Sequence, residues 1–441
     1  MIQERSRAAT PIERLVRPFQ DFASLEASGG ILLIGCTIAA LLWTNSRWAA
    51  SYLHFWHTEV TIGLGSARFS ESLHFWINDG MMAVFFFLVG LEIKRQTLIG
   101  ELASFKRVVL PIAAAIGGML VPAGLYMLFN HGGPGARGWG IPVATDIAFA
   151  LGVLALLGDR VPAPLKVFLA ALAIVDDLGA VLIIALFYTA TISWVSLAVA
   201  GGIFAALILL NRAGTREPLV YILLGIGLWI ALLRSGVHPT VAGVLLAVTI
   251  PARERLDGPS FVASCERVLV ELKSVEHEPD EIEKSANKSA ALHLLNEDCA
   301  EAESLLLRFE HALNPWVKNL VMPVFALANA GVVLRGDAMN DLFHPVGLGI
   351  LFGLILGKPI GIFGFAWLAT WTGAAALPDR VNWRQVLGVG FLGGIGFTMS
   401  LFVANLAFDQ ALSLETAKIG ILAASVVAGL AGAAVLLSRS R

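Results

Sequence analysis

Four charged residues lie near the middle of long apolar stretches of this 441-residue chain: Asp146, Asp176, Asp177 and Lys358. If these stretches cross a membrane, each charge costs about 2.5–3.5 kcal/mol at the centre of its helix, and on the order of 10 kcal/mol in total. Ion pairs that only hold helices together would leave negative charge unpaired, because three carboxylates face one lysine. The excess carboxylates therefore point to a bound cation or proton.

The spacing of these residues indicates how the work is divided. Neighbouring residues on a helix point about 100° apart, so Asp176 and Asp177 cannot face the same partner. One can pair with Lys358 while the other stays available for a cation. The Thr145 hydroxyl and the Asp146 carboxylate add oxygen ligands of the kind that hard cations prefer. Burial beside a second carboxylate also favours the protonated form of a carboxylic acid, so a proton and a cation would compete for one site.

Two helix breaks would add backbone carbonyls to such a site. Pro142 lies four residues before Asp146 and lacks a backbone donor. Gly393, Gly394 and Gly396 interrupt another apolar stretch near its middle. Gly- or Pro-interrupted segments in matching halves of a chain are typical of transporter sites.

The composition defines the class of protein that holds these residues. Hydrophobic residues make up 57% of the chain and charged residues 15%, with a mean hydropathy of +0.75. Soluble proteins are about 45–50% apolar and about 25% charged, so a cytosolic enzyme and a disordered chain are both excluded. The net charge of −2 gives no nucleic-acid signal. Three scattered cysteines predict neither a disulfide framework nor a metal site, and we expect no cofactor.

Twelve apolar segments predict an all-α polytopic membrane protein, since a crossing needs about 20 residues. No AxA-type cleavage site follows the first segment, which we interpret as a retained span. The segments are 25–43, 74–93, 108–129, 139–157, 164–188, 194–211, 218–233, 238–251, 315–334, 345–371, 385–408 and 416–437.

The basic residues predict the orientation. With the N-terminus inside, 24 of the 31 Lys and Arg residues fall on the cytoplasmic side and 6 on the outer side, as the positive-inside rule requires. Both termini are therefore expected in the cytoplasm. The predicted organisation is a cytoplasmic segment 1–24, helices one to eight in 25–251, an acidic cytoplasmic insert 252–313, helices nine to twelve in 314–437, and a tail 438–441.

Two connections differ from the short loops elsewhere. Residues 58–70 alternate apolar and polar side chains around a Gly-Leu-Gly-Ser turn, which predicts a β-hairpin on the outer face. A lone hairpin is marginally stable, so its own copy in a dimer is the expected partner. The insert 252–313 carries 14 acidic and 7 basic residues with apolar residues at helical spacing. A solvated helical insert is the simpler interpretation, and a regulatory role is the alternative.

A rim of charged residues lies where spans meet the cytoplasm: Glu92 and Arg95 at the end of the second span, and Glu310 and His311 at the start of the ninth. Histidine titrates near pH ~6.5, so this rim could sense cytoplasmic pH. Such residues are also ordinary interfacial anchors.

The chain resembles the NhaA-type sodium/proton antiporters of bacterial inner membranes. The resemblance covers nearly the whole chain from about residue 21, and its motifs occur in the family's order. They are Leu91-Glu92-Ile93-Lys94-Arg95, residues 144–152 around Thr145-Asp146, residues 175–180 around Asp176-Asp177, Ser235-Gly236-Val237-His238, Gly357-Lys358-Pro359 and residues 393–400.

The resemblance implies inverted repeats and a discontinuous fourth and eleventh helix that cross at the midplane. It implies that Asp177 is the main sodium ligand and proton carrier, helped by Asp146 and Thr145, and that Asp176 pairs with Lys358. Exchange is then electrogenic, and the membrane potential contributes ~2.3 kcal/mol per net charge per 100 mV. Lithium is expected to be transported in the same way as sodium.

The resemblance also implies alkaline activation through the rim residues Glu92, Arg95, Glu310 and His311, and a homodimer formed through the outer hairpin. The sequence departs from the family's pattern in two places. The 252–313 insert is longer than in the best-known members, and Asn314 replaces a second histidine of the rim. Both departures concern regulation.

Two other functions use similar residues. An intramembrane aspartyl protease needs two facing carboxylates, for which Asp146 and Asp177 are candidates, but no GxGD element is present. A sodium-coupled solute symporter would share the ion site and need a larger cavity. Sodium/proton exchange by a transporter, not an enzyme, is the function that the residues favour.

Overall fold

The computed structural model describes residues 28–64, 67–100, 105–189, 192–253, 258–275, 281–334, 342–408 and 410–438. The predicted N-terminal segment 1–24 lies outside these residues, as do residues 439–441 of the predicted tail.

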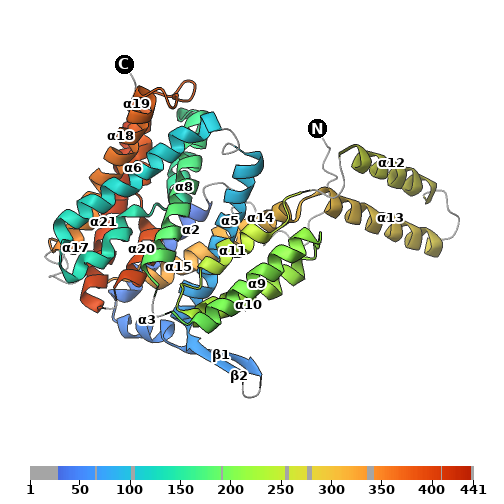
Figure 1. The fold of residues 1–441 in the computed structure, drawn as a ribbon, viewed down its shortest axis with the longest axis horizontal. Helices are drawn as coiled ribbons and strands as arrows, with labels where there is room; N and C mark the ends of the chain where they lie inside the picture. The colour runs from blue at the N-terminus through green and yellow to red at the C-terminus, as the bar shows by residue number, and fades with distance from the viewer. Residues whose placement is uncertain are drawn as a thin grey trace.

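The described chain is a bundle of apolar helices (Figure 1). Eight of its helical segments are long and apolar enough to cross a membrane, and two bent helix pairs bring the number to as many as ten. The eight are Leu73–Leu98, Val108–Asn130, Pro134–Leu157, Ala163–Phe187, Trp194–Arg212, Pro218–Ser235, Pro345–Trp371 and Ala411–Leu437. A mainly helical chain with many candidate membrane spans is therefore confirmed.

Two of the twelve predicted segments are shorter or more polar than a full span. The predicted eighth segment contains only the nine-residue helix α11 (Val241–Thr249). The predicted ninth, 315–334, begins at the end of α14 (Leu305–Trp316) and includes a π-helical turn η5 (Val317–Val321) and α15 (Met322–Asn329).

Two segments are interrupted in the middle of the bundle. Residues Pro134–Val143 form a 3₁₀ helix, η3, and extended backbone follows to Asp146 before α7 (Ile147–Leu157) begins. Near the other end of the chain, α19 (Trp383–Gly393) and α20 (Phe397–Ala407) are bent by 44° at a three-residue break. Both breaks fall where proline and glycine predicted them.

A β-hairpin is present at the predicted position. Strands β1 (Glu59–Leu64) and β2 (Ala67–Ser72) pair antiparallel, with Ile62 opposite Phe69. The ring of Phe69 contacts Trp76 and Trp229, which fastens the hairpin to the bundle. The hairpin projects from one end of the molecule (Figure 1).

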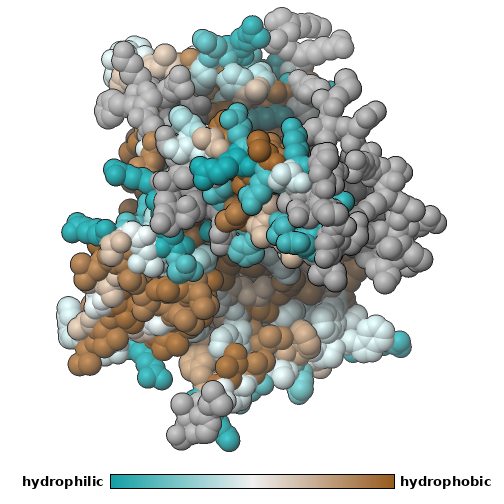
Figure 2. Space-filling view, turned by 90° about the vertical axis from the view of Figure 1, so that its right-hand side faces the viewer, coloured by the Kyte–Doolittle hydropathy of each residue, from teal (hydrophilic) through white to brown (hydrophobic). Residues whose placement is uncertain are grey.

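The described part of the acidic insert forms two helices, α12 (Gly258–Val275) and α13 (Glu281–Ala302), which lie side by side away from the bundle (Figure 1). The Ser264 hydroxyl donates to Oδ2 of Asp298 across the pair at 2.6 Å. Figure 2 shows hydrophilic side chains above a broad hydrophobic area on this side of the molecule. Exposed apolar residues of α9 (Trp194–Arg212) and α10 (Pro218–Ser235) include Val195, Leu209 and Leu223.

Helix α18, which carries the buried Lys358, approaches a neighbouring helix closely at a pair of glycines. α6 (Phe105–Asn130) lies against α18 (Lys358–Trp371). A Cβ added to Gly361 would lie 2.1 Å from the Gly117 carbonyl oxygen, and one on Gly117 would lie 2.2 Å from the Gly361 oxygen. The two backbones are thus in direct contact, one turn from Lys358.

Candidate ion-binding site

The two helix breaks meet and exchange hydrogen bonds. The Asp146 amide donates to the Ile395 carbonyl at 2.7 Å. The Thr145 hydroxyl donates to the Gly393 carbonyl at 2.8 Å. Each break leaves backbone groups without partners in its own helix, and each break supplies partners for the other. Segments about 250 residues apart in the sequence are thereby fixed to one another in the core.

The Asp146 carboxylate accepts bonds from both interrupted segments. Its Oδ1 accepts from the Phe149 amide at 2.9 Å, which caps α7. Its Oδ2 accepts from the Thr398 amide at 3.1 Å and from the Thr398 hydroxyl. Asp146 is fully buried. This carboxylate therefore lies at the start of α7 and close to the start of α20.

Lys358 and Asp176 form a buried ion pair. Nζ of Lys358 lies 2.7 Å from Oδ2 of Asp176, and the two side chains are 0% and 1% exposed. Asp176 comes from the middle of α8 (Ala163–Phe187), and Lys358 begins α18. Neither charge has access to water, so each depends on the other for compensation.

Asp177 differs from its neighbour. Its side chain is 1% exposed, and within the described ranges neither carboxylate oxygen has a hydrogen-bond partner. Asp177 interacts unfavourably with the charges of Asp176, Asp146 and Glu92, and favourably with that of Lys358. Since Lys358 is bonded to Asp176, the local charge around Asp177 is negative.

Two further features qualify this site. The described residues contain no cluster of three or more His, Cys, Asp or Glu side chains placed to hold a metal ion. Thr398, which was not among the predicted site residues, contributes two bonds to Asp146. A hydroxyl residue two positions after the last glycine of the break was the available signal.

The predicted glycines of the break are required for space. Two of the three, Gly394 and Gly396, have negative φ, −76° and −85°. A Cβ on Gly394 would lie 2.3 Å from the Leu354 carbonyl oxygen, and one on Gly396 would lie 2.1 Å from the Ser400 hydroxyl. Pro142, the last residue but one of η3, contacts Gly353 in the candidate span Pro345–Trp371.

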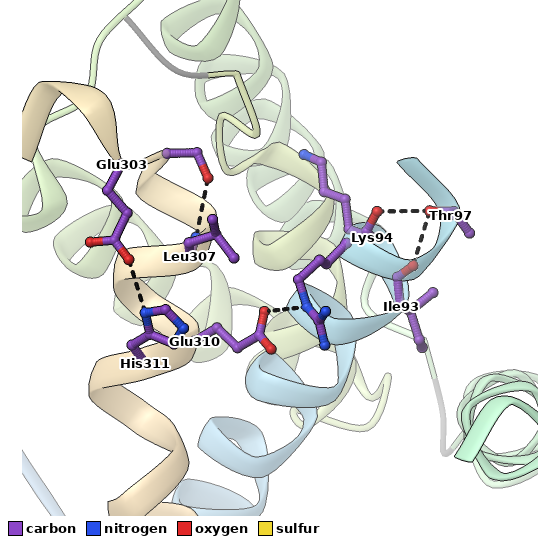
Figure 3. Close-up of polar contacts among 9 residues, drawn as sticks. Ile93, Lys94, Thr97, Glu303, Leu307, Glu310 and His311 are labelled. Atoms are coloured by element: carbon purple, nitrogen blue, oxygen red, sulfur yellow. Dashed lines mark hydrogen bonds and ion pairs between the residues drawn. The ribbon is translucent and has the colours of Figure 1, made fainter. Parts of the chain in front are cut away.

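The charged rim is only partly assembled. Nε of Arg95, at the end of α5 (Met82–Ile99), donates to Oε2 of Glu310 on α14 at 2.9 Å. Glu92 interacts with both of these charges. Figure 3 shows Glu310 pointing toward α5, whereas His311 points away, toward Glu303. Nδ1 of His311 lies 2.9 Å from Oε1 of Glu303, the residue that follows α13, so the histidine does not join the Arg95–Glu310 contact.

Lys94 connects α5 to the short helix α11. Its Nζ donates to the Val248 carbonyl at 2.6 Å and to the Ile250 carbonyl. A lysine at this position compensates the negative end of the α11 dipole. Helix α5 thus makes two interhelical links, one through Lys94 to α11 and one through Arg95 to α14.

The candidate spans define a polytopic helical membrane protein, and its core contains buried ionisable residues. Ionisable residues inside a membrane are typical of ion pathways. A sequence profile of the family described as Na+/H+ antiporter 1 matches residues 20–436. The chain belongs to this family.

Curated relatives from three bacteria resemble nearly the full chain. A protein named Na(+)/H(+) antiporter NhaA from Oleidesulfovibrio alaskensis is 52% identical over 425 residues, which is 96% of this chain and 94% of the relative. One of the same name from Koribacter versatilis is 52% identical over 436 residues, covering 99% and 94%. Na(+)/H(+) antiporter NhaA 2 from Syntrophotalea carbinolica is 51% identical over 423 residues, covering 96% of each.

Proposed function

We propose that this chain exchanges sodium or lithium for protons across a bacterial inner membrane. The observation that carries the proposal is Asp177, a buried carboxylate without a hydrogen-bond partner in the described part of the chain, in negative surroundings. A buried carboxylate in such surroundings needs either a proton or a cation. The named relatives are sodium/proton antiporters, which is consistent with these two ligands.

Competition between a sodium ion and a proton for Asp177 would produce exchange of the two. A sodium ion would be held by the Asp177 and Asp146 carboxylates and the Thr145 hydroxyl, and would dehydrate as it enters. A proton on Asp177 removes the charge that attracts the ion. If the site can switch its access from one side of the membrane to the other only with sodium or a proton bound, uptake of protons on one side drives release of sodium on the other. The Lys358–Asp176 pair would balance part of the core charge during this cycle.

The exchange is proposed to be electrogenic, with more protons entering than sodium ions leaving. A net inward charge then lets the membrane potential contribute ~2.3 kcal/mol per 100 mV. Sodium and protons are the transported species, and the proposed cycle requires no cofactor.

The proposed membrane arrangement has twelve spans, both termini in the cytoplasm and the two interrupted segments crossing at the midplane within inverted repeats. The contacts of Asp146 with Ile395 and Thr398 support such a crossing. Residues 25–251 and 314–437 would form the transport unit. Residues 252–313 would form a separate cytoplasmic insert.

Regulation and assembly are part of the same proposal. Glu92, Arg95, Glu310 and His311 would make activity depend on cytoplasmic pH, which the Arg95–Glu310 contact between α5 and α14 supports. The outer hairpin would join two copies of the chain. Its exposed Ile62 offers an apolar contact for this purpose.

The proposal is tested in proteoliposomes that hold an imposed pH gradient. We expect added sodium or lithium, but not potassium, to dissipate the gradient. Asp177→Asn should abolish this response, because an amide cannot exchange a proton for a cation. Glu283→Gln, an exposed change on α13, is the control and should leave the rate unchanged. Exchange at the wild-type rate in Asp177→Asn would refute the assignment.

A further inference from the structure

A cavity of about 560 Å³ lies at one end of the bundle, away from the proposed ion site. It is formed where η4 (Gly158–Arg160), the start of α19 and the last turn of α21 (Ala411–Leu437) come together. Figure 1 shows α19 and the C-terminal end of α21 at the same end of the molecule. We call it the terminal cavity. Its lining residues are Arg160, Asn382, Arg384, Gln385, Val435, Leu436, Leu437 and Ser438.

The polar side of the terminal cavity offers mainly hydrogen-bond donors. Two guanidinium groups reach it from different elements, and none of the described residues that line it is acidic. Nη2 of Arg384 donates to the Ser438 hydroxyl, which in turn donates to the Val435 carbonyl at 2.8 Å. This chain of bonds holds the head of Arg384 over the end of α21.

The two amide side chains strengthen this donor character. Oδ1 of Asn382 accepts from the Gln385 amide at 2.9 Å, and Oε1 of Gln385 accepts from the Asn382 amide at 3.0 Å. This capping box occupies the acceptor oxygens of both side chains. Their side-chain N–H groups are not used by this capping box, and both residues lie at the N-terminus of the eleven-residue helix α19.

A cluster of guanidinium and N–H donors fits an anion, and the fork of arginine matches the oxygens of a phosphate group. The opposite wall is apolar, formed by Val435, Leu436 and Leu437. Leu437 is 43% exposed and Leu430, two turns earlier on α21, is 68% exposed. The cavity is thus continuous with an apolar outer helix surface of the kind that faces acyl chains.

We propose that the terminal cavity binds the phosphate group of an anionic phospholipid, with Arg160 and Arg384 as the phosphate ligands and the α21 wall against the acyl chains. Basic pockets between spans at the membrane surface have the chemistry for such head groups. A free phosphate ion would use the same donors but gain nothing from the apolar wall. The site is independent of the proposed ion exchange.

The test measures binding to purified, delipidated full-length protein by native mass spectrometry, with phosphatidylglycerol, phosphatidylcholine or inorganic phosphate as probes. We expect the Arg160→Gln/Arg384→Gln variant to bind phosphatidylglycerol at least about tenfold more weakly than the wild type, since charge-assisted bonds are the strongest ones lost. Arg212→Gln, at the end of α9, is the matched control and should bind as the wild type does. Binding of phosphatidylcholine should differ less between the wild type and the double variant.

The other outcomes identify the source of the phosphate or reject the site. If the double variant binds inorganic phosphate more weakly than the wild type but binds phosphatidylglycerol equally well, the cavity is a site for soluble phosphate and the lipid proposal is rejected. Equal phosphatidylglycerol binding by wild type and double variant would overturn the proposal, as would an equal loss in Arg212→Gln. Arg384→Lys keeps the charge and loses the fork, so weaker binding by this variant would separate phosphate geometry from charge alone.

Discussion

The Lys358–Asp176 pair allows a quantitative prediction. In Lys358→Met, Asp176 keeps its place in the core and loses the cation 2.7 Å away, with 1% of its side chain exposed. Breaking a buried ion pair on one side costs about 3–5 kcal/mol. At a few degrees per kcal/mol, this predicts a melting temperature lower by on the order of 10 °C.

The neutral double variant separates charge from packing. Asp176→Asn together with Lys358→Met leaves no isolated charge, so we expect it to regain about half or more of the lost stability. The measurement is thermal unfolding of the purified proteins in one detergent. Lys288→Met, on the exposed side of α13, is the control. If Lys358→Met melted at the wild-type temperature, or if the double variant were less stable than both single variants, the pair would not be the buried compensation that we infer.

Three further predictions follow from other contacts. Thr398→Val removes a hydroxyl bond to Asp146, and should lower the free energy of unfolding by about 1.5–3 kcal/mol, measurable in the same melting assay. Gly361→Ala should lower the melting temperature, since its Cβ would collide with the α6 backbone; Gly364→Ala, with nothing within 4 Å, should not. Arg95→Gln breaks the link from α5 to α14 and should move the activity–pH profile while the maximal exchange rate is kept; an unmoved profile would argue against a regulatory rim.

Local signals predicted the helix breaks and the hairpin. Proline at 142 and glycine at 393, 394 and 396 remove backbone donors or side-chain bulk, and these effects act within a few residues. The alternation in 58–70 likewise predicted strands that the structure places at 59–64 and 67–72. Such features depend on nearby residues, so they can be found without knowing the rest of the fold.

Contacts between distant segments could not be derived in this way. Spacing alone could not decide whether Asp176 or Asp177 faces Lys358, because the answer depends on the rotation of α8 relative to α18. The same holds for His311. Adjacent to Glu310 in the sequence, it points to Glu303, and only the path of the insert determines this partner. The twelve-span count stays a prediction: eight to ten candidate spans are found among the described residues, and the predicted segment that contains the short helix α11 is not one of them.

The direct backbone contact between Gly117 and Gly361 has a mechanical consequence. Side chains between two helices can change rotamer and let the helices slide, but here no side chain separates the backbones. Sliding of α6 past α18 would have to break this backbone contact, which favours movement of the two helices together. Lys358 begins α18, so any force that acts on the lysine through its aspartate is transmitted to two long helices at once.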